Sequence, residues 1–414
     1  MTLASAAAPL TLGRAWDVLE GFFTAVAAFC PELDGIEAAG GVRRFEPLPA
    51  PLIVTARADD PPGAISAIAN IAAVTRLSLR SGRRIVVGFR GHDIDVRVAT
   101  ADEYGTTLFA ATGPEHHVEQ IQRRRGPRPS ATEAEIYAQA GLMFVPPEIR
   151  DAPDALEAAV QHRVPDLVTR DDIRGDLHMH TSSSDGQDTA REMVTECCAL
   201  GYQFMAITDH SEHAAASRTV SPEALVRQRH EIERLRREFP QIEILHGIEV
   251  DILPDGTLDC ADQVLESLDI VLASLHEPAG QDGAQLTARC LRAIRHPLVS
   301  IVTHPSNRLV GRRPGYDLDY PALYAAAAET GTVLEVDGGP GHLDLDGPHA
   351  REAVAAGVTV SIDSDCHRAR SLERQMRLGV GTARRGWVGA GAVLNTRPIA
   401  EVRAFVARKR ASGA

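Results

Sequence analysis

Lysine is almost absent from this chain of 414 residues, which contains a single lysine, Lys409, among 43 basic residues. A Schiff-base mechanism needs a lysine amine in the active site, and a Walker-type loop needs one to hold phosphate. A single lysine near the C-terminus excludes both kinds of mechanism. Arginine must therefore carry any recognition of phosphate.

Cysteine, long apolar runs and positive charge are also scarce. The six cysteines show no Cys-x-x-Cys spacing, which argues against a disulfide framework. The apolar run 22–30 is too short to cross a bilayer and no basic segment precedes it, so we expect neither a membrane helix nor a signal peptide and place the protein in the cytoplasm. The net charge of −13 argues against a broad basic surface for nucleic acid, although it does not exclude a local groove.

The chain is 44% apolar and 24% charged, which is typical of one large or two ordinary globular domains. From residue 173 onward, strand-like and helix-like segments alternate, and this pattern predicts parallel strands joined by helical crossovers. Seven repeats favour a closed barrel over an open sheet. The expected strands span residues 173–177, 204–208, 242–250, 269–275, 299–303, 332–336 and 358–363.

The region before residue 173 has a different pattern. We expect a helix over 11–30, and a smaller α+β domain with strands over 52–55, 84–89 and 94–98 followed by one helix over 104–125. Proline-rich segments then predict a connecting region over 126–172, with a helix over 131–141 whose start carries the capping-box pair Thr132 and Glu135. The predicted domains are therefore 1–125, the connecting region 126–172, and 173–414.

Six of the seven expected strands end beside residue types that bind metals, the strand over 332–336 being the exception. In barrels of parallel strands, functional residues gather at the C-terminal ends. A single histidine there is usually an ordinary loop residue, but six such strand ends together indicate a metal site. The candidate ligands are His178, His180, Asp185, His210, Glu249, His276, His304, Asp365 and His367.

Imidazole and carboxylate ligands without thiolate favour Zn²⁺, Mn²⁺ or Fe²⁺ over Mg²⁺, which prefers oxygen alone. Nine ligands exceed the needs of one ion and would fill three sites. Glu249 is the natural bridge between sites because it is the only glutamate among them.

The segments that carry these ligands resemble the motifs of the PHP (polymerase and histidinol phosphatase) family. The chain from about residue 130 onward more closely resembles the C-terminal half of bacterial X-family DNA polymerases. The segments that carry these resemblances are 175–181, 207–210, 247–249, 273–276, 303–305 and 363–367 for the family, and 146–150, 254–259, 312–316, 384–387 and 394–396 for the polymerases.

The resemblance implies a seven-stranded (β/α) barrel with a trinuclear metal centre at its mouth. By this likeness the first metal is held by His178, His180, Glu249 and Asp365, the second by Glu249, His276 and His304, and the third by Asp185, His210 and His367. It also implies Mn²⁺-dependent hydrolysis of phosphodiesters or phosphomonoesters, which in the polymerases is a 3′ to 5′ exonuclease.

The N-terminal part resembles the nucleotidyltransferase domain of the same polymerases with a notable loss. Residues 40–44 lie where that family has a Gly-Ser-Arg-Arg type motif, and 92–98 match the strand with the third catalytic aspartate, at Asp95. The expected Asp-x-Asp pair is missing, since no acid lies between Glu46 and Asp59. Two-metal nucleotidyl transfer needs those carboxylates, so we expect a shortened, degenerate domain without polymerase activity.

Further catalytic roles follow for five residues. Glu249 is expected to hold the metals that activate water, and Asp209 to orient the adjacent ligand. Arg308, Arg312 and Arg313 follow His304 and suit bidentate phosphate contacts, although surface salt bridges explain them equally well. His116, His117 and His342 are expected to be ordinary surface or loop histidines.

Three functions agree with these features. The first is a phosphoesterase that acts on DNA 3′ ends, and the second is a phosphatase of the histidinol-phosphate type that acts on a phosphorylated small molecule. The third is a non-catalytic DNA-repair scaffold with structural metals. The full ligand set argues against the scaffold, because structural zinc sites are closed and four-coordinate.

Overall fold

A computed structural model describes residues 10–214 and 216–411. The chain forms two compact units, Met1–Pro165 and Asp166–Ala414. Most of the segment 126–172, which the sequence suggested as a connecting region, belongs to the first unit, and only 166–172 belong to the second. No helix of the described chain is long and apolar enough to cross a membrane.

The second unit contains a nearly closed barrel of seven parallel strands whose order in space follows the chain. This confirms the predicted α/β barrel. The first and last strands are joined beyond their ends by a parallel bridge between Met179 and Cys366. The strands are β6 (Gly175–Asp176), β7 (Phe204–Ile207), β8 (Glu243–Asp251), β9 (Ile270–Ser274), β10 (Ile301–Val302), β11 (Val333–Asp337) and β12 (Val360–Asp363).

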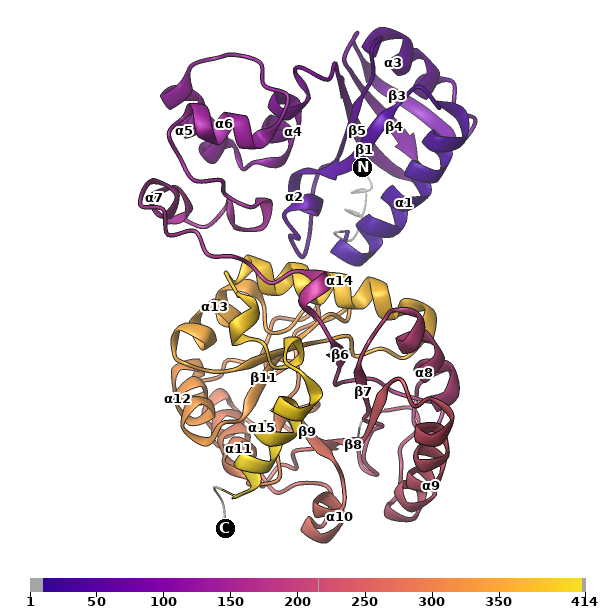
Figure 1. The fold of residues 1–414 in the computed structure, drawn as a ribbon, viewed down its shortest axis with the longest axis vertical. Coiled ribbons are helices and arrows are strands. Elements are labelled where there is room, and N and C mark those ends of the chain that lie inside the picture. The colour runs from indigo at the N-terminus through magenta and orange to yellow at the C-terminus, as the bar shows by residue number, and fades with distance from the viewer. Residues whose placement is uncertain (1–9, 215, 412–414) are drawn as a thin grey trace, which may run out of the picture. The chain divides into compact units, whose positions relative to one another are not determined.

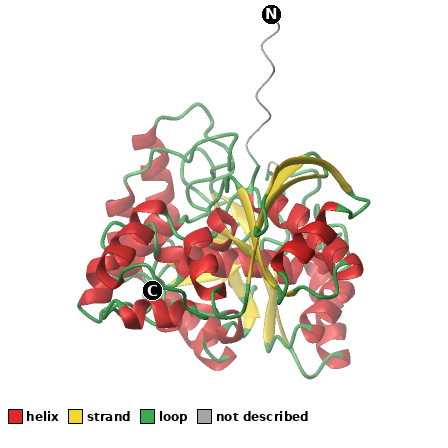
Figure 2. Ribbon diagram, turned by 90° about the horizontal axis from the view of Figure 1, so that it is seen from above, coloured by secondary structure: helices red, strands yellow, loops and turns green. Residues whose placement is uncertain are grey.

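Helices surround these strands on the outside (Figures 1 and 2). Capping side chains mark the starts of several of them: Thr189 and Glu192 form a reciprocal capping box, as do Asp282 and Gln285. The helices are α8 (Ala190–Ala199), α9 (Pro222–Glu238), α10 (Asp262–Glu266), α11 (Gly283–Arg295), α12 (Tyr320–Thr330), α13 (Gly347–Ala355), α14 (Leu372–Arg385) and α15 (Ile399–Ala411).

The strands bury both of their faces, because alternate side chains point inward and outward. On β9, Val271 and Ala273 belong to the outer core beneath the helices, whereas Ile270 and Leu272 belong to an inner cluster. Helix α15 contributes Val402 and Val406 to the inner cluster, together with the first residues of β7 and β9, so it covers the end of the barrel at which the strands begin. The single lysine lies on this helix, is buried, and donates a hydrogen bond to the carbonyl of Ile294 at 2.8 Å.

Five of the seven strands are shorter than predicted, and β8 and β11 keep the predicted length but lie one residue later in the chain. Strands β6 and β10 have two residues each, because side chains replace part of the ladder; the backbone N–H of Leu177, for example, donates to Asp363 Oδ1 at 2.8 Å. Strand β11 extends to Asp337, so the sixth strand also ends on a carboxylate. The prediction that it lacks such a residue was wrong.

The first unit contains a five-stranded sheet in the order β1-β2-β5-β4-β3, in which only β2 and β5 are parallel. The sequence predicted the three inner strands and missed the two edge strands, of which β3 is exposed along most of its length. The strands are β1 (Asp34–Ala39), β2 (Leu52–Arg57), β3 (Val74–Arg80), β4 (Arg84–Phe89) and β5 (His92–Ala99). The helices are α1 (Leu12–Phe29), α2 (Gly40–Arg43), α3 (Pro61–Ala69), α4 (Tyr104–Thr112), α5 (Glu115–Arg125), α6 (Glu133–Gln139) and α7 (Ala155–Val160).

The single helix expected over 104–125 is two helices, α4 and α5. Pro114 causes the break, because proline lacks an N–H and forces the preceding residue, Gly113, into an extended conformation. On α5, His117 is buried and lies 2.8 Å from the hydroxyl of Tyr137, so the expectation of a surface histidine was wrong.

Candidate metal centre

All nine predicted metal ligands lie together where the strands of the second unit end. Glu249 is on β8, and the histidines follow β6, β7, β9, β10 and β12. Asp185 reaches the same place from the loop before α8. The nine side chains form overlapping groups whose donor atoms approach within 4.8 Å of one another.

The first group surrounds one oxygen of Glu249. Its Oε2 lies 3.4 Å from His178 Nε2 and 3.5 Å from His180 Nε2. Asp365 Oδ1 lies 3.1 Å from His180 Nε2 and 3.6 Å from His178 Nε2. Four donors at about 2.1 Å from one tetrahedral ion would be separated by about 3.4 Å, so these distances suit a shared cation.

Two further groups lie beside the first. Glu249 Oε1 is 3.0 Å from His304 Nε2 and 3.4 Å from His276 Nε2. Asp185 Oδ1 is 3.2 Å from His367 Nε2 and 3.6 Å from His210 Nε2. The two oxygens of Glu249 therefore face different sets of donors, as a bridging ligand requires.

Two carboxylate oxygens in these groups are buried without a hydrogen bond. Among the described residues, neither Glu249 Oε2 nor Asp185 Oδ1 has such a partner. An anionic oxygen removed from water costs free energy unless a cation or a donor compensates it. The donor types, their spacing and these two oxygens fit divalent metal ions.

The electrostatics of the cluster lead to the same conclusion. Burial favours the neutral forms of these groups, but the Glu249 and Asp251 carboxylates outweigh burial at His276 and raise its pKa to about 10. At His367, burial is likewise outweighed by Asp185 and Asp365, and the pKa rises to about 9. The histidines hold the pKa of Glu249 well below its usual range. The carboxylates thus attract positive charge, which divalent ions would supply in place of protons.

Comparison with known proteins gives the family. The PHP domain model matches residues 176–301. A probable phosphatase of Syntrophotalea carbinolica is 31% identical over 208 residues, which cover 48% of this chain and 81% of that protein. The chain belongs to the PHP family. Its relatives place it among the phosphoesterases of the PHP type.

A longer similarity extends into the first unit. The DNA polymerase/3′-5′ exonuclease PolX of Bacillus subtilis is 39% identical over 333 residues, which cover 76% of this chain. The chain spans 58% of the length of that relative. A crystal structure of histidinol phosphate phosphatase from Lactococcus lactis, with zinc, L-histidinol and phosphate, aligns over 51% of this chain and 94% of that chain with 18% identity and a TM-score of 0.41.

Two carboxylates that the sequence analysis missed hold the histidines of this PHP centre. Glu335 on β11 lies 2.7 Å from His178 Nδ1 and accepts the backbone N–H of His304 at 2.8 Å. Asp251, two residues after Glu249, contacts His276 Nδ1. Such contacts fix the ring orientation and raise the basicity of the other ring nitrogen. Glu335 lies within an otherwise apolar stretch of β11, and Asp251 is the last residue of β8. Acids at buried strand positions were the available signal.

Asp209 organises a loop of the PHP centre. It is fully buried and accepts hydrogen bonds from Thr181 and Ser184 at 2.7–3.2 Å and from Gln228 Nε2 at 2.5 Å. No bond to the adjacent His210 ring occurs among the contacts of the described chain. The predicted orienting role therefore applies to the loop that leads to Asp185 rather than to His210.

The three predicted phosphate-binding arginines differ in their contacts. Arg308 donates from Nε to the carbonyl of His342 at 2.8 Å and from a terminal nitrogen to Asp346 at 3.0 Å, so a phosphate would have to replace existing partners. Arg313 donates to the Asn307 carbonyl at 2.7 Å. Arg312 is exposed.

His342, expected to be an ordinary loop histidine, lies beside the second donor group. Its ring stacks on that of His304, with centroids 5.3 Å apart and planes 26° apart. Burial lowers its pKa to about 4, and nearby His304 acts in the same direction. The loop that carries it follows β11, the strand whose contribution the sequence analysis missed.

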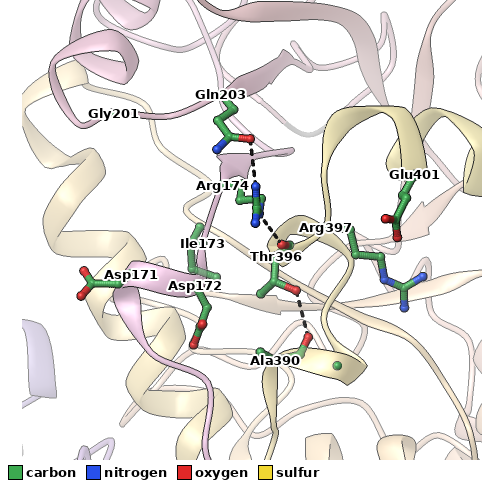
Figure 3. A pocket seen from close by; sticks show the side chains of 11 residues that line it. Asp171, Asp172, Ile173, Arg174, Gly201, Gln203, Ala390, Thr396, Arg397 and Glu401 are labelled. Carbon is green, nitrogen blue, oxygen red and sulfur yellow. Dashed lines mark hydrogen bonds between the residues drawn. The ribbon is translucent and has the colours of Figure 1, made fainter.

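A separate cavity of about 630 Å³ lies where the barrel strands begin, with Arg174 before β6 and Gln203 before β7 in its lining (Figure 3). Arg174 donates to the Thr396 carbonyl at 2.9 Å and to Gln203 Oε1 at 3.3 Å. None of the nine predicted ligands lines this cavity. It is therefore distinct from the PHP centre at the other ends of the strands.

Proposed function

We propose that this protein is a phosphoric ester hydrolase with three divalent ions, Mn²⁺ or Zn²⁺ and alternatively Fe²⁺, that removes nucleotides from DNA 3′ ends. The observation that carries this proposal is Glu249, whose two oxygens face separate donor groups beside a third group around Asp185. A linked set of ions suits an in-line displacement at phosphorus, because attacking and leaving oxygens both need stabilisation.

The residues of the chain have separate tasks in this proposal. Bound divalent ions would supply an activated water and neutralise charge on phosphate oxygens. Glu249, Asp365 and Asp185 would hold those ions together with the six histidines. Glu335 keeps the His178 ring oriented through its Nδ1 contact at 2.7 Å. Arg312 and Arg313 follow His304 in the chain and suit contacts to phosphate.

We further propose that residues 1–125 are a degenerate X-family polymerase domain without polymerase activity. In register with Asp95 on the neighbouring parallel strand is Ile53 rather than an acid. Asp95 itself accepts hydrogen bonds from Arg84 at 2.8 Å and from Arg97 at 3.0 Å. An acid already paired with two guanidiniums, and without neighbouring carboxylates, is poorly suited to hold two catalytic ions.

The test incubates the protein and Mn²⁺ with a 5′-labelled primer-template and, separately, with histidinol phosphate. We expect the wild type to shorten the primer stepwise. The Asp365→Ala variant should leave the primer at its full length. Added deoxynucleoside triphosphates should give no extension. Primer extension would contradict the assignment of residues 1–125.

A phosphatase that acts on a small molecule of the histidinol-phosphate type is the second candidate. The observation in its favour is the similarity to probable phosphatases that match most of their own length, 81% in one case. Phosphate release from histidinol phosphate without primer shortening would establish this function instead. Inactivity on both substrates would favour a DNA-repair scaffold.

A further inference from the structure

A groove of about 570 Å³ lies beside the third donor group and follows α8. Gln187 and Arg191 line one side, and the segment 368–370 lines the other. The backbone N–H of Gln187 donates to the carbonyl of His367 at 2.8 Å. Gln187 is two residues from Asp185, and Arg368 directly follows His367, so both walls begin at predicted metal ligands.

Two arginines of the groove carry charge that no carboxylate neutralises. Within the described chain, the guanidinium groups of Arg368 and Arg370 have no hydrogen bond or ion pair. An arginine without a carboxylate partner retains its positive potential and keeps its donors available for an anion.

The other charged groups of the groove are already occupied, with one exception. Asp188 accepts the backbone N–H of Ala369 at 2.8 Å, and Glu192 accepts the backbone N–H of Thr189 at 2.8 Å. Arg191 is paired with Glu238 at 2.7 Å. Glu196 is the exception. All three acids keep their negative charge, so attraction for an anion is confined to the two guanidiniums of Arg368 and Arg370. Arg368 and Arg370 are thus the donors of the groove that are available to an anion.

We propose that this groove binds the phosphate next to the scissile one in a nucleic-acid strand, with Arg368 and Arg370 as the phosphate contacts. The inference rests on the proposed nuclease function and names the part of the substrate that lies outside the metal centre. A small monoester has one phosphate, which the metal centre itself would hold. Such a substrate has no second phosphate for the groove to bind. A strand has further phosphates at regular spacing, and a guanidinium pairs with each of them in bidentate fashion.

The test compares the wild type with the double variant Arg368→Ala/Arg370→Ala on two substrates. One is a thymidine decanucleotide, and the other is the dinucleotide, whose single phosphate is the scissile one. In the double variant we expect kcat/KM on the decanucleotide to fall about tenfold to a hundredfold, mainly through a higher KM. The fold-loss of kcat/KM on the dinucleotide should be at least about fivefold smaller. The salt dependence of KM should become shallower by about 0.7 units of log–log slope, because one phosphate of a single strand loses its contacts.

Arg237→Ala/Arg295→Ala is the matched control. Both residues are exposed arginines in the last turns of α9 and α11, their guanidinium groups have no ion pair among the described residues, and neither lines the groove. This double variant also removes two positive charges but should leave the ratio between the two substrates unchanged. Arg368→Lys/Arg370→Lys should recover part of the lost kcat/KM, which a variant that merely damages the fold would not do.

Three results would overturn the proposal: equal losses on both substrates, no loss, or an equal loss in the control. Should the wild type cleave neither substrate, the proposed nuclease function fails while the groove is still tested. Fluorescence anisotropy with a labelled decanucleotide then measures binding to the full chain with Mn²⁺. A Kd about tenfold weaker in the Arg368→Ala/Arg370→Ala variant supports the groove, and an unchanged Kd refutes it.

Discussion

Each unit of the protein buries a carboxylate on an inner strand of its sheet, and the two carboxylates have opposite surroundings. Asp95 on β5 is 5% exposed and pairs with Arg84 and Arg97, two permanent cations. Glu249 on β8 is fully buried among histidines, whose charge depends on protons. The charge of Asp95 is already balanced by protein, whereas Glu249 keeps its binding capacity for an added cation.

The neighbouring strands strengthen this difference. Asp95 lies in register with Ile53, which belongs to an apolar cluster with Tyr104 and Leu108. Beside Glu249, the hydroxyl of Thr303 donates to Oε1 at 3.1 Å, and further strands supply histidines. A buried acid therefore indicates a metal site only when adjacent strands bring more ligands to it.

The largest effect is expected from Glu249→Gln, which would make the second unit resemble the first by removing its bridging charge. The change removes the carboxylate whose two oxygens face two donor groups. We therefore expect the phosphodiesterase kcat to fall by about a thousandfold or more. Metal content measured by mass spectrometry should fall in parallel. A Glu249→Gln variant that retains both activity and metal would contradict the proposed difference between Glu249 and Asp95.

Glu335→Gln should have the next largest effect. It weakens the contact that orients His178 while leaving the nine ligands in place, so we expect about a tenfold to hundredfold loss in metal affinity or activity. Calorimetric titration with Mn²⁺ measures the affinity. Glu329→Gln, an exposed position on α12, is the control.

Removing the metals should expose the proton dependence of the second unit. The pKa values of His276 and His367 are raised to about 10 and about 9, above the value of about 6.5 for an unfolded histidine. Such groups stabilise the fold fully below the unfolded pKa, and this stabilisation is lost as the pH rises through the folded values. The metal-free protein should therefore melt at a lower temperature near pH 10 than near pH 7.

The Mn²⁺-loaded protein is the reference for that measurement, because bound metal replaces the same protons. Its transition temperature should depend less on pH over the same range. If the transition temperature changes with pH in the same way with and without Mn²⁺, the assignment of these histidines as ligands is contradicted. His276→Gln should reduce the pH dependence of the metal-free protein.

The smallest effect is expected in the first unit. Asp95→Asn leaves Arg84 and Arg97 without their anion, and because Arg84 is 46% exposed we expect a loss of only about 1 kcal/mol in the free energy of unfolding. Nuclease activity should stay unchanged. Urea denaturation measures the change, and Asp93→Asn, whose pair with Arg76 is more exposed, should cost less. A large loss of nuclease activity in Asp95→Asn would show that the two units are not independent.

Much of the barrel could be predicted because its sequence signals are local. Alternation of apolar strands with capped helices, such as the one that starts after Thr189, predicted the architecture. The strand ends predicted eight of the nine clustered residues, and Asp185 came from the loop before α8. The residues that hold the ligands were harder to predict. Glu335 contacts His178, which lies 157 positions away in the sequence, and only the closed sheet brings them together.

The errors in the first unit have a different cause. Edge strand β3 lacks a buried face: its alternate apolar residues Leu77 and Leu79 are exposed, and so short an alternation is a weak signal for a strand. The break between α4 and α5 depended on Pro114 alone, in a segment that is otherwise consistent with one helix. Patterns of burial thus predict inner elements well and edges poorly.

Lys409 makes the last helix experimentally accessible. A lysine-specific protease has one cleavage point within this chain, and the target side chain is 3% exposed on α15, next to residues that pack into the barrel. Cleavage therefore requires this helix to leave its place. The rate at which the protease removes the segment after Lys409 would report how firmly the barrel is closed, without any label and in the unmodified protein.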